Sequence, residues 1–109
     1  MTLRVALLSL ALLVLPGAAS ADVLVSAVPE RVPCGAVLKP GVWYQAYSGG
    51  PRRATIVVRR GGHTVLRKRI RATETWRYWR VRPRCGARYV VVYRLSGGPV
   101  RFPVRVAAR

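Results

Sequence analysis

Apolar and polar residues alternate with a period of two along this chain from residue 23 onward. Turn signals rich in Gly and Pro interrupt the alternation roughly every ten residues. Because a β-strand points successive side chains to opposite faces, this period is typical of strands that bury one face and expose the other. No segment carries a convincing helical stripe of apolar residues. The sequence therefore predicts an all-β fold, a small antiparallel sandwich of seven strands.

The predicted strands lie between the turn signals and cover residues 23–28, 42–48, 54–60, 64–72, 75–82, 88–95 and 100–107. Gly61-Gly62 predicts a tight hairpin, because a two-residue primed turn needs positive φ angles that glycine adopts without strain. In the last strand Arg101 and Arg105 lie in the outward phase. Lys68 lies in the inward phase of its strand, which is typical of a charge that protects a sheet edge from aggregation.

The first 21 residues have the organisation of a cleaved secretory signal peptide. A positive charge at Arg4 precedes an apolar run over residues 5–15, and small residues at Ala19 and Ala21 indicate cleavage after Ala21. The apolar run is shorter than the roughly 20 residues of a membrane-spanning helix, and no second apolar stretch follows. We therefore expect residues 22–109 to form a single β-sandwich domain, secreted or periplasmic, without a transmembrane segment.

Two cysteines, Cys34 and Cys85, remain in the exported chain, and each is followed by a glycine. An even pair in an oxidising compartment is typical of one disulfide, which for a loop of this size stabilises the domain by roughly 4 kcal/mol in the chain-entropy model. A redox or metal role is the alternative, but the sequence has no CxxC motif and no cluster of His and Cys residues. We predict a Cys34–Cys85 disulfide, no metal site and no cofactor.

The charge of the chain is strongly one-sided, with 20 Lys and Arg residues against 3 Asp and Glu residues and a formal net charge of +17. A field of this sign attracts nucleic acid, acidic glycans, anionic lipid and acidic proteins. The sequence thus predicts a secreted binding module whose partner is an anionic polymer or surface, or an acidic protein surface. Two alternatives stay open: a structural or envelope protein without a specific ligand, and an inhibitor of an extracellular enzyme.

Residue types that carry catalysis are scarce in this sequence. Hydrolysis of glycosides needs two placed carboxylates, and the chain offers only Asp22, Glu30 and Glu74. His63 is the only histidine, and it follows a predicted tight turn, where an exposed hairpin residue is expected. Nucleophile and base pairs, metal-ligand spacings and glycine-rich phosphate loops are absent from the sequence. We therefore predict that the protein is not an enzyme.

The segment from residue 76 to residue 82 is the strongest local candidate for a binding surface. In strand phase Trp76 and Tyr78 share an outward face with arginines, whereas Trp79 and Val81 point into the core. Aromatic rings beside guanidinium groups stack on bases or sugars and pair with anions. A hairpin through residues 72–75 would bring this face beside the arginines of the preceding strand. The predicted anion-binding residues are Arg67, Arg69, Arg71, Arg80, Arg82, Trp76 and Tyr78.

A solvated charge row is the alternative interpretation of these arginines, and the aromatic rings would then pack beneath arginine stems. Such a row limits aggregation without binding a ligand. The two interpretations differ in whether the basic and aromatic residues act together on a partner.

Two resemblances accompany these patterns. Short strands with one disulfide resemble immunoglobulin domains in architecture only: in that family a Tyr lies two residues before the second Cys, whereas Pro83 and Arg84 precede Cys85 here. The triplet Trp76-Arg77-Tyr78 resembles the one that small secreted bacterial α-amylase inhibitors, also disulfide-bonded β-sandwiches, present to their enzyme. The triplet lies later in this chain than in that family, and this chain lacks the family's second disulfide. The resemblance implies the inhibitor alternative.

Overall fold

The structure is a computed structural model that describes residues 12–14, 23–46, 54–95 and 98–109. Strands and loops make up this part of the chain, and it contains no helix that is long and apolar enough to span a bilayer. The predicted cleavage site after Ala21, Asp22, the Gly- and Pro-rich turn signal at residues 48–51 and the first two residues of the turn signal at 96–99 lie outside the described residues. The prediction of an all-β fold is confirmed.

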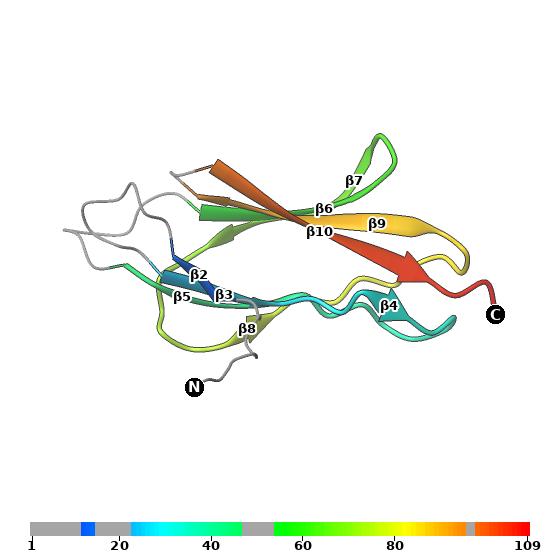
Figure 1. The fold of residues 1–109 in the computed structure, drawn as a ribbon, viewed down its shortest axis with the longest axis horizontal. Helices are drawn as coiled ribbons and strands as arrows, with labels where there is room; N and C mark the ends of the chain where they lie inside the picture. The colour runs from blue at the N-terminus through cyan, green and yellow to red at the C-terminus, as the bar shows by residue number, and fades with distance from the viewer. Residues whose placement is uncertain (1–11, 15–22, 47–53, 96–97) are drawn as a thin grey trace, which may run out of the picture.

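The strands form two sheets, which Figure 1 shows as two layers. The five-stranded sheet has the order β4-β10-β9-β6-β7 and consists of β4 (Arg31–Val32), β6 (Ala54–Arg60), β7 (His63–Ile70), β9 (Arg88–Leu95) and β10 (Gly98–Val106). The four-stranded sheet has the order β2-β3-β5-β8 and consists of β2 (Leu12–Val14), β3 (Val23–Ala27), β5 (Gly41–Gln45) and β8 (Arg77–Tyr78). Neighbouring strands pair antiparallel, except that β4 runs parallel to β10.

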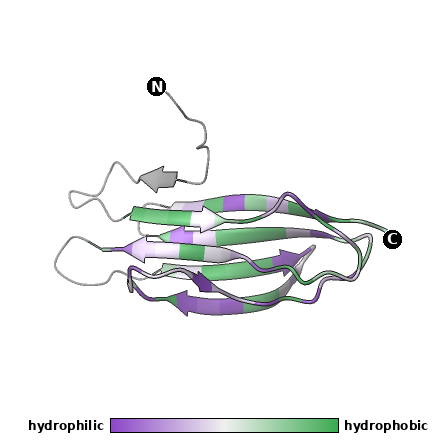
Figure 2. Ribbon diagram, turned by 90° about the horizontal axis from the view of Figure 1, so that it is seen from below, coloured by the Kyte–Doolittle hydropathy of each residue, from purple (hydrophilic) through white to green (hydrophobic). Residues whose placement is uncertain are grey.

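One apolar core joins the two sheets. Leu24 and Tyr44 of the four-stranded sheet belong to the same buried cluster as Ile56 and Tyr93 of the five-stranded sheet. The Tyr93 hydroxyl donates a buried hydrogen bond of 2.7 Å to the backbone carbonyl oxygen of Gly41, on β5. Figure 2 shows hydrophobic residues along strands of both sheets. The layers are thus held together by apolar burial and by a polar contact that crosses the core.

The Cys34–Cys85 disulfide is present, with 4.9 Å between the two Cα atoms. It connects the turn that follows β4 to the turn that precedes β9. Both cysteines belong to Gly-containing turns, and Gly35 and Gly86 adopt positive φ angles of 90° and 79°. The predicted pairing of the two cysteines is therefore confirmed.

The predicted strand positions are mostly confirmed. Strands β6 and β9 coincide with the predicted ranges 54–60 and 88–95, and β9 is the central strand of its sheet. The predicted strand 75–82 is too long, because only β8 is a regular strand within it. The segment opposite its second half contains Pro40, which has no N–H to continue the hydrogen-bond ladder. Strand β4 has two residues, too few for a detectable alternation. The prediction of seven strands is therefore confirmed only in part.

The strand β2 comes from the segment predicted to be a signal peptide. It pairs antiparallel with β3, so that Leu12 is opposite Val25. Among the described residues β2 is therefore the edge of the four-stranded sheet, and β3 would take that position in a chain that starts after Ala21.

The predicted hairpin through residues 72–75 is wrong. Strand β7 is the edge of the five-stranded sheet, whereas β8 is the edge of the four-stranded sheet. The connection passes from one layer to the other, and the Glu74 N–H donates to the carbonyl oxygen of Tyr44 at 3.1 Å. Glu74 adopts a φ of 56°, in the left-handed region that non-glycine residues rarely occupy. The chain thus turns away from β7 at a non-glycine residue, so the sequence contains no glycine that would indicate this turn.

Candidate anion-binding face

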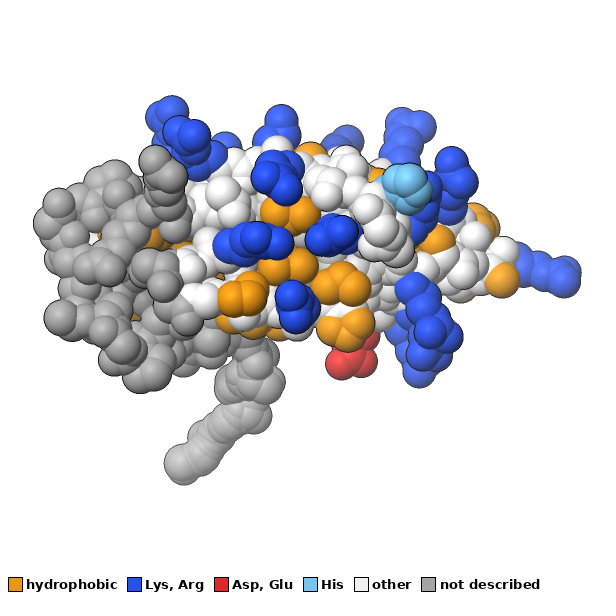
Figure 3. All heavy atoms as spheres, turned by 90° about the horizontal axis from the view of Figure 1, so that it is seen from above, with side chains coloured by type: hydrophobic (Ala, Val, Ile, Leu, Met, Phe, Trp, Pro, Cys, Tyr) orange, Lys and Arg blue, Asp and Glu red, His pale blue; other side chains and the backbone are white. Residues whose placement is uncertain are grey.

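The outward side of the five-stranded sheet carries a dense set of arginines. In one cross-strand row Arg101 of β10 and Arg67 of β7 flank the two central strands, and in the next row Arg94 and Arg69 are on either side of Thr55. We call the outward arginines of this sheet the basic face, and they are Arg31, Arg59, Arg67, Arg69, Arg88, Arg94, Arg101 and Arg105. Figure 3 views this side and shows Lys and Arg side chains across it, with hydrophobic side chains between them.

Two valines at the centre of this outward side are buried although they point away from the core. Val57 and Val92 are directly opposite each other, and their side chains are only 2% and 3% exposed. Their row ends in Arg101 and Arg67, and long arginine side chains bury their aliphatic stems along apolar surface while the charged groups reach solvent. We attribute the burial of these valines to the surrounding arginine stems, which spreads the guanidinium groups over the sheet.

Acidic residues are sparse around the basic face. Of the carboxylates in the part of the chain that the structure describes, Glu30 directly precedes β4 at the rim of this sheet. Glu74 belongs to the connection between β7 and β8. The outward rows of β6, β7, β9 and β10 therefore contain positive, apolar and hydroxyl-bearing side chains only, which gives this side a one-signed field.

The sequence-predicted site residues are divided between the two sheets. Arg67 and Arg69 belong to the basic face, and Arg71 is exposed one residue beyond the end of β7. The remaining predicted residues are on or beside the strand at the edge of the other sheet, and they are Trp76, Tyr78, Arg80 and Arg82. The predicted continuous face of these residues is therefore wrong, because the hairpin that would join them is not formed.

The predicted division of the aromatic side chains is confirmed. Trp76 and Tyr78 are 45% and 57% exposed, whereas Trp79 packs against the core. The rings of Trp76 and Tyr78 stack with centroids 6.0 Å apart and planes at 18°. The Tyr78 ring lies over Gly41, where a Cβ atom would come within 2.5 Å of it. A side chain at position 41 would therefore displace this ring.

The Trp76-Arg77-Tyr78 triplet does not present its three side chains together. Arg77 is half-buried, and its guanidinium carbon is 5.6 Å from the centre of the Trp79 ring. The stacked aromatic pair is thus exposed without the arginine between its members. This geometry does not favour the mode of binding that the resemblance to α-amylase inhibitors implies.

Most of the basic face was missed by the sequence-based site prediction. The missed arginines are Arg31, Arg59, Arg88, Arg94, Arg101 and Arg105. The phase of the last strand did place Arg101 and Arg105 outward, and this is confirmed by their exposure. What the sequence did not contain was the strand order, which brings β4, β10, β9, β6 and β7 side by side.

Comparisons of this chain with protein-family models, with curated proteins and with solved structures find no match. The described residues contain no group of three or more His, Cys, Asp and Glu side chains that could hold a metal ion. The chemistry of the candidate site therefore has to be inferred from the basic face itself. Guanidinium groups on a sheet bind oxyanions through charge-assisted hydrogen bonds.

Proposed function

We propose that the protein is a secreted, strongly basic β-sandwich binding module whose basic face holds an anionic polymer such as an acidic glycan or a nucleic acid. One observation carries the proposal: the outward arginines come from every strand of one sheet and form a single surface. The predicted signal peptide and the disulfide support secretion, because disulfides persist in oxidising compartments.

The electrostatic repulsion between these arginines favours a ligand of opposite charge. Like charges directly opposite each other in a sheet destabilise the fold, and Arg105 has an arginine partner on both sides. Solvation and salt screen part of this repulsion. A polyanion removes it and releases its own condensed counterions, which is the main source of affinity in non-specific binding of nucleic acid.

The residue types between the arginines indicate recognition by charge. Between the arginines, the outward rows of the five-stranded sheet contain valine, proline and threonine but no Phe, Tyr or Trp among the described residues. Stacking of bases on such rings therefore does not contribute to affinity on this face. We infer that the basic face binds the backbone charges of a phosphorylated, sulfated or carboxylated polymer with little preference for its sequence.

The test is the salt dependence of binding to duplex DNA and to heparin, with two matched double variants. Arg94→Gln/Arg101→Gln removes two charges from the basic face, and Arg80→Gln/Arg82→Gln removes two exposed charges from the segment beside β8. Each arginine that contacts a DNA phosphate contributes about 0.9 to the slope of log K against log salt. We expect the first variant to lower that slope by about 1.8 and the second to leave it near that of the wild type.

Equal losses in the two double variants would contradict the proposal, because binding would then follow net charge and not the face. Elution of the wild type at low salt from immobilised duplex DNA and from immobilised heparin would also contradict the proposal. That outcome would favour the alternative of a structural or envelope protein without a specific ligand. The inhibitor alternative requires an extracellular enzyme that this protein inhibits at stoichiometric concentration.

A further inference from the structure

Three arginines of the basic face form a direct cross-strand row at one end of the sheet. Arg105 of β10 is the register partner of Arg31 on β4 and also of Arg88 on β9. Arg105 and Arg88 are antiparallel partners, whose Cβ atoms lie about 4.5–5.5 Å apart, and Arg31 is beside Arg105 on the parallel strand β4, so the three long side chains can reach a common ligand. All three side chains are exposed, which leaves their donor groups available to a ligand.

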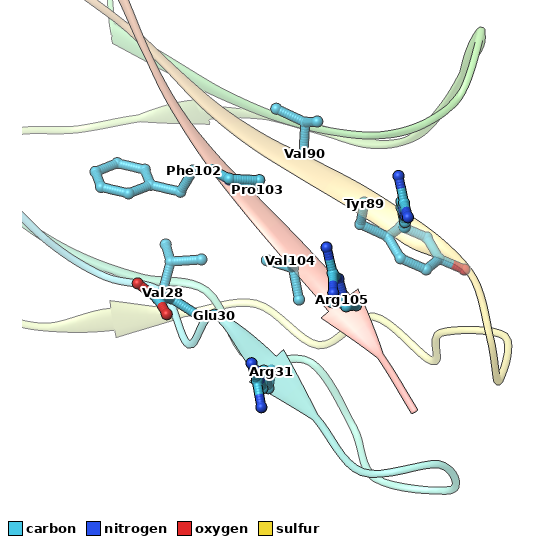
Figure 4. A pocket seen from close by; sticks show the side chains of 10 residues that line it. Val28, Glu30, Arg31, Tyr89, Val90, Phe102, Pro103, Val104 and Arg105 are labelled. Carbon is cyan, nitrogen blue, oxygen red and sulfur yellow. The ribbon is translucent and has the colours of Figure 1, made fainter. Parts of the chain in front are cut away.

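The same three arginines line a cavity of about 470 Å³. The cavity exists because β4 pairs with β10 only over Arg105 and Val106, and the chain before β4 leaves the edge of β10 uncovered. Figure 4 shows the cavity between the edge of β10 and the chain that leads into β4. A recess at an unpaired strand edge and a triple arginine row therefore occur at the same place.

Apolar residues line the cavity as well, on both faces of β10. Val90 and Pro103 are register partners in the outward phase of the arginines, whereas Phe102 and Val104 are in the inward phase, and Val28 belongs to the chain before β4. Glu30 also lines the cavity, and in Figure 4 its carboxylate points away from the side chains of Arg31 and Arg105. The cavity thus combines three positive groups with an adjoining hydrocarbon wall.

We propose that this cavity binds an amphiphilic oxyanion, a phosphate or sulfate monoester joined to an alkyl chain. The planar guanidinium group donates paired hydrogen bonds to oxyanions, and three such groups match a tetrahedral head with several acceptor oxygens. The alkyl chain covers Val90 and Pro103, which line the cavity in the same outward phase as the arginines. This site adds a discrete ligand to the basic face and does not require that the remaining arginines bind a polymer.

The experiment is isothermal titration of the intact protein with octyl phosphate below its micelle concentration, with inorganic phosphate and with octyl glucoside. We expect octyl phosphate to bind most tightly and inorganic phosphate more weakly, while octyl glucoside does not bind. In a series from ethyl to octyl phosphate, affinity rises by up to about fourfold for each CH₂ that contacts the apolar wall. Affinity that stays constant along the series, or equal binding of octyl glucoside, overturns the proposal.

The matched variants are Arg105→Gln and Arg101→Gln, two outward arginines on the same strand, of which only Arg105 lines the cavity. We expect Arg105→Gln to weaken octyl phosphate binding by about tenfold or more, and Arg101→Gln to change it by less than about threefold. Both variants remove one charge from the basic face, so polymer binding should fall similarly in both. Equal effects of the two variants on octyl phosphate overturn the site while leaving polymer binding separately measurable.

Vesicles distinguish the two sources of an amphiphilic oxyanion, a lipid head group and a soluble ligand. Cosedimentation of the wild type with phosphatidylcholine vesicles that contain phosphatidic acid, lost in Arg105→Gln and retained in Arg101→Gln, assigns the site to a lipid head group. Tight binding of octyl phosphate without cosedimentation assigns it to a soluble ligand. If Arg88→Gln weakens octyl phosphate binding as much as Arg105→Gln does, the three-arginine row is supported. If Arg88→Gln leaves octyl phosphate binding unchanged, the three-arginine row is contradicted.

Discussion

The hydroxyl of Tyr93 provides the sharpest test of how the two sheets are held together. It donates a buried hydrogen bond to the carbonyl oxygen of Gly41, 52 residues away in the chain and in the other sheet. The Tyr93 ring also meets Phe102 edge to face, with centroids 5.8 Å apart. Replacement of Tyr93 by Phe keeps the ring and its packing and removes only the hydroxyl.

The expected cost follows from the burial of the acceptor. Gly41 and Tyr93 are both buried, so the Gly41 carbonyl loses a donor that bulk water does not readily replace. A buried polar group left without its partner costs about 1–3 kcal/mol. For a domain of this size we expect the Tyr93→Phe variant to melt about 5–20 °C below the wild type.

The pH dependence of stability carries an independent signature. Burial raises the pKa of Tyr93 above its ordinary value of 10.0, because the phenolate is poorly solvated in the core. Above pH 10 the unfolded chain releases this proton while the folded chain retains it, so the wild type loses about 1.4 kcal/mol of stability per pH unit. Phenylalanine has no such proton. Because an unfolded tyrosine is only half ionised at pH 10, the stability difference between wild type and Tyr93→Phe should shrink by about 1 kcal/mol from pH 10 to pH 11.

The assay is urea denaturation followed by far-ultraviolet circular dichroism at pH 7, 10 and 11. Tyr78→Phe is the control, because Tyr78 is 57% exposed, whereas Tyr93 is buried. We expect this control to differ from the wild type by less than about 0.5 kcal/mol at every pH. The reasoning is refuted if Tyr93→Phe is as stable as the control at pH 7, or if its deficit stays constant up to pH 11.

The remaining predictions concern the disulfide and the two tryptophans. The Cys34–Cys85 bridge closes a loop with a sequence separation of 51, so Cys34→Ala/Cys85→Ala should lose about 4 kcal/mol in the free energy of unfolding; a loss below about 1 kcal/mol in urea denaturation would contradict the entropic account. Trp79→Ala should cost about 3 kcal/mol, because Trp79 packs against the core, and the exposed Trp76 about 1 kcal/mol or less. Thermal melting of both variants checks this order, and a larger loss in Trp76→Ala would reverse the assignment of faces.

Much of the secondary structure was predictable from local pattern. Strands β6 and β9 have the predicted bounds, because each contains a short apolar run and is followed by a strong turn signal. The prediction that Lys68 belongs to an edge strand is confirmed as well, since β7 is the outermost strand of its sheet, and the Lys68 side chain is exposed there. Strand β4 could not be predicted, because two residues hold no period and its parallel pairing with β10 is a contact between distant parts of the chain.

The candidate site was predictable only in its components. The burial of Trp79 and the exposure of Trp76 followed from strand phase and are confirmed. Their union with Arg67 and Arg69 depended on a hairpin that is not formed. The connection through Glu74 has enough residues to close a hairpin or to cross between layers, and nothing local decides between these paths. The apolar faces of both sheets decide it, because each must be buried against the other.

The sequence by itself determined the strand phases, the sign of the charge and the pairing of the only two cysteines. These properties are local or compositional: side chains alternate along any extended strand, and an even pair of cysteines has one partner each. The tertiary structure alone decided that arginines from five strands share one face, and that three of them meet at a cavity beside Phe102. The physical reason is that strand order depends on which apolar faces can share a core, a property of the whole chain.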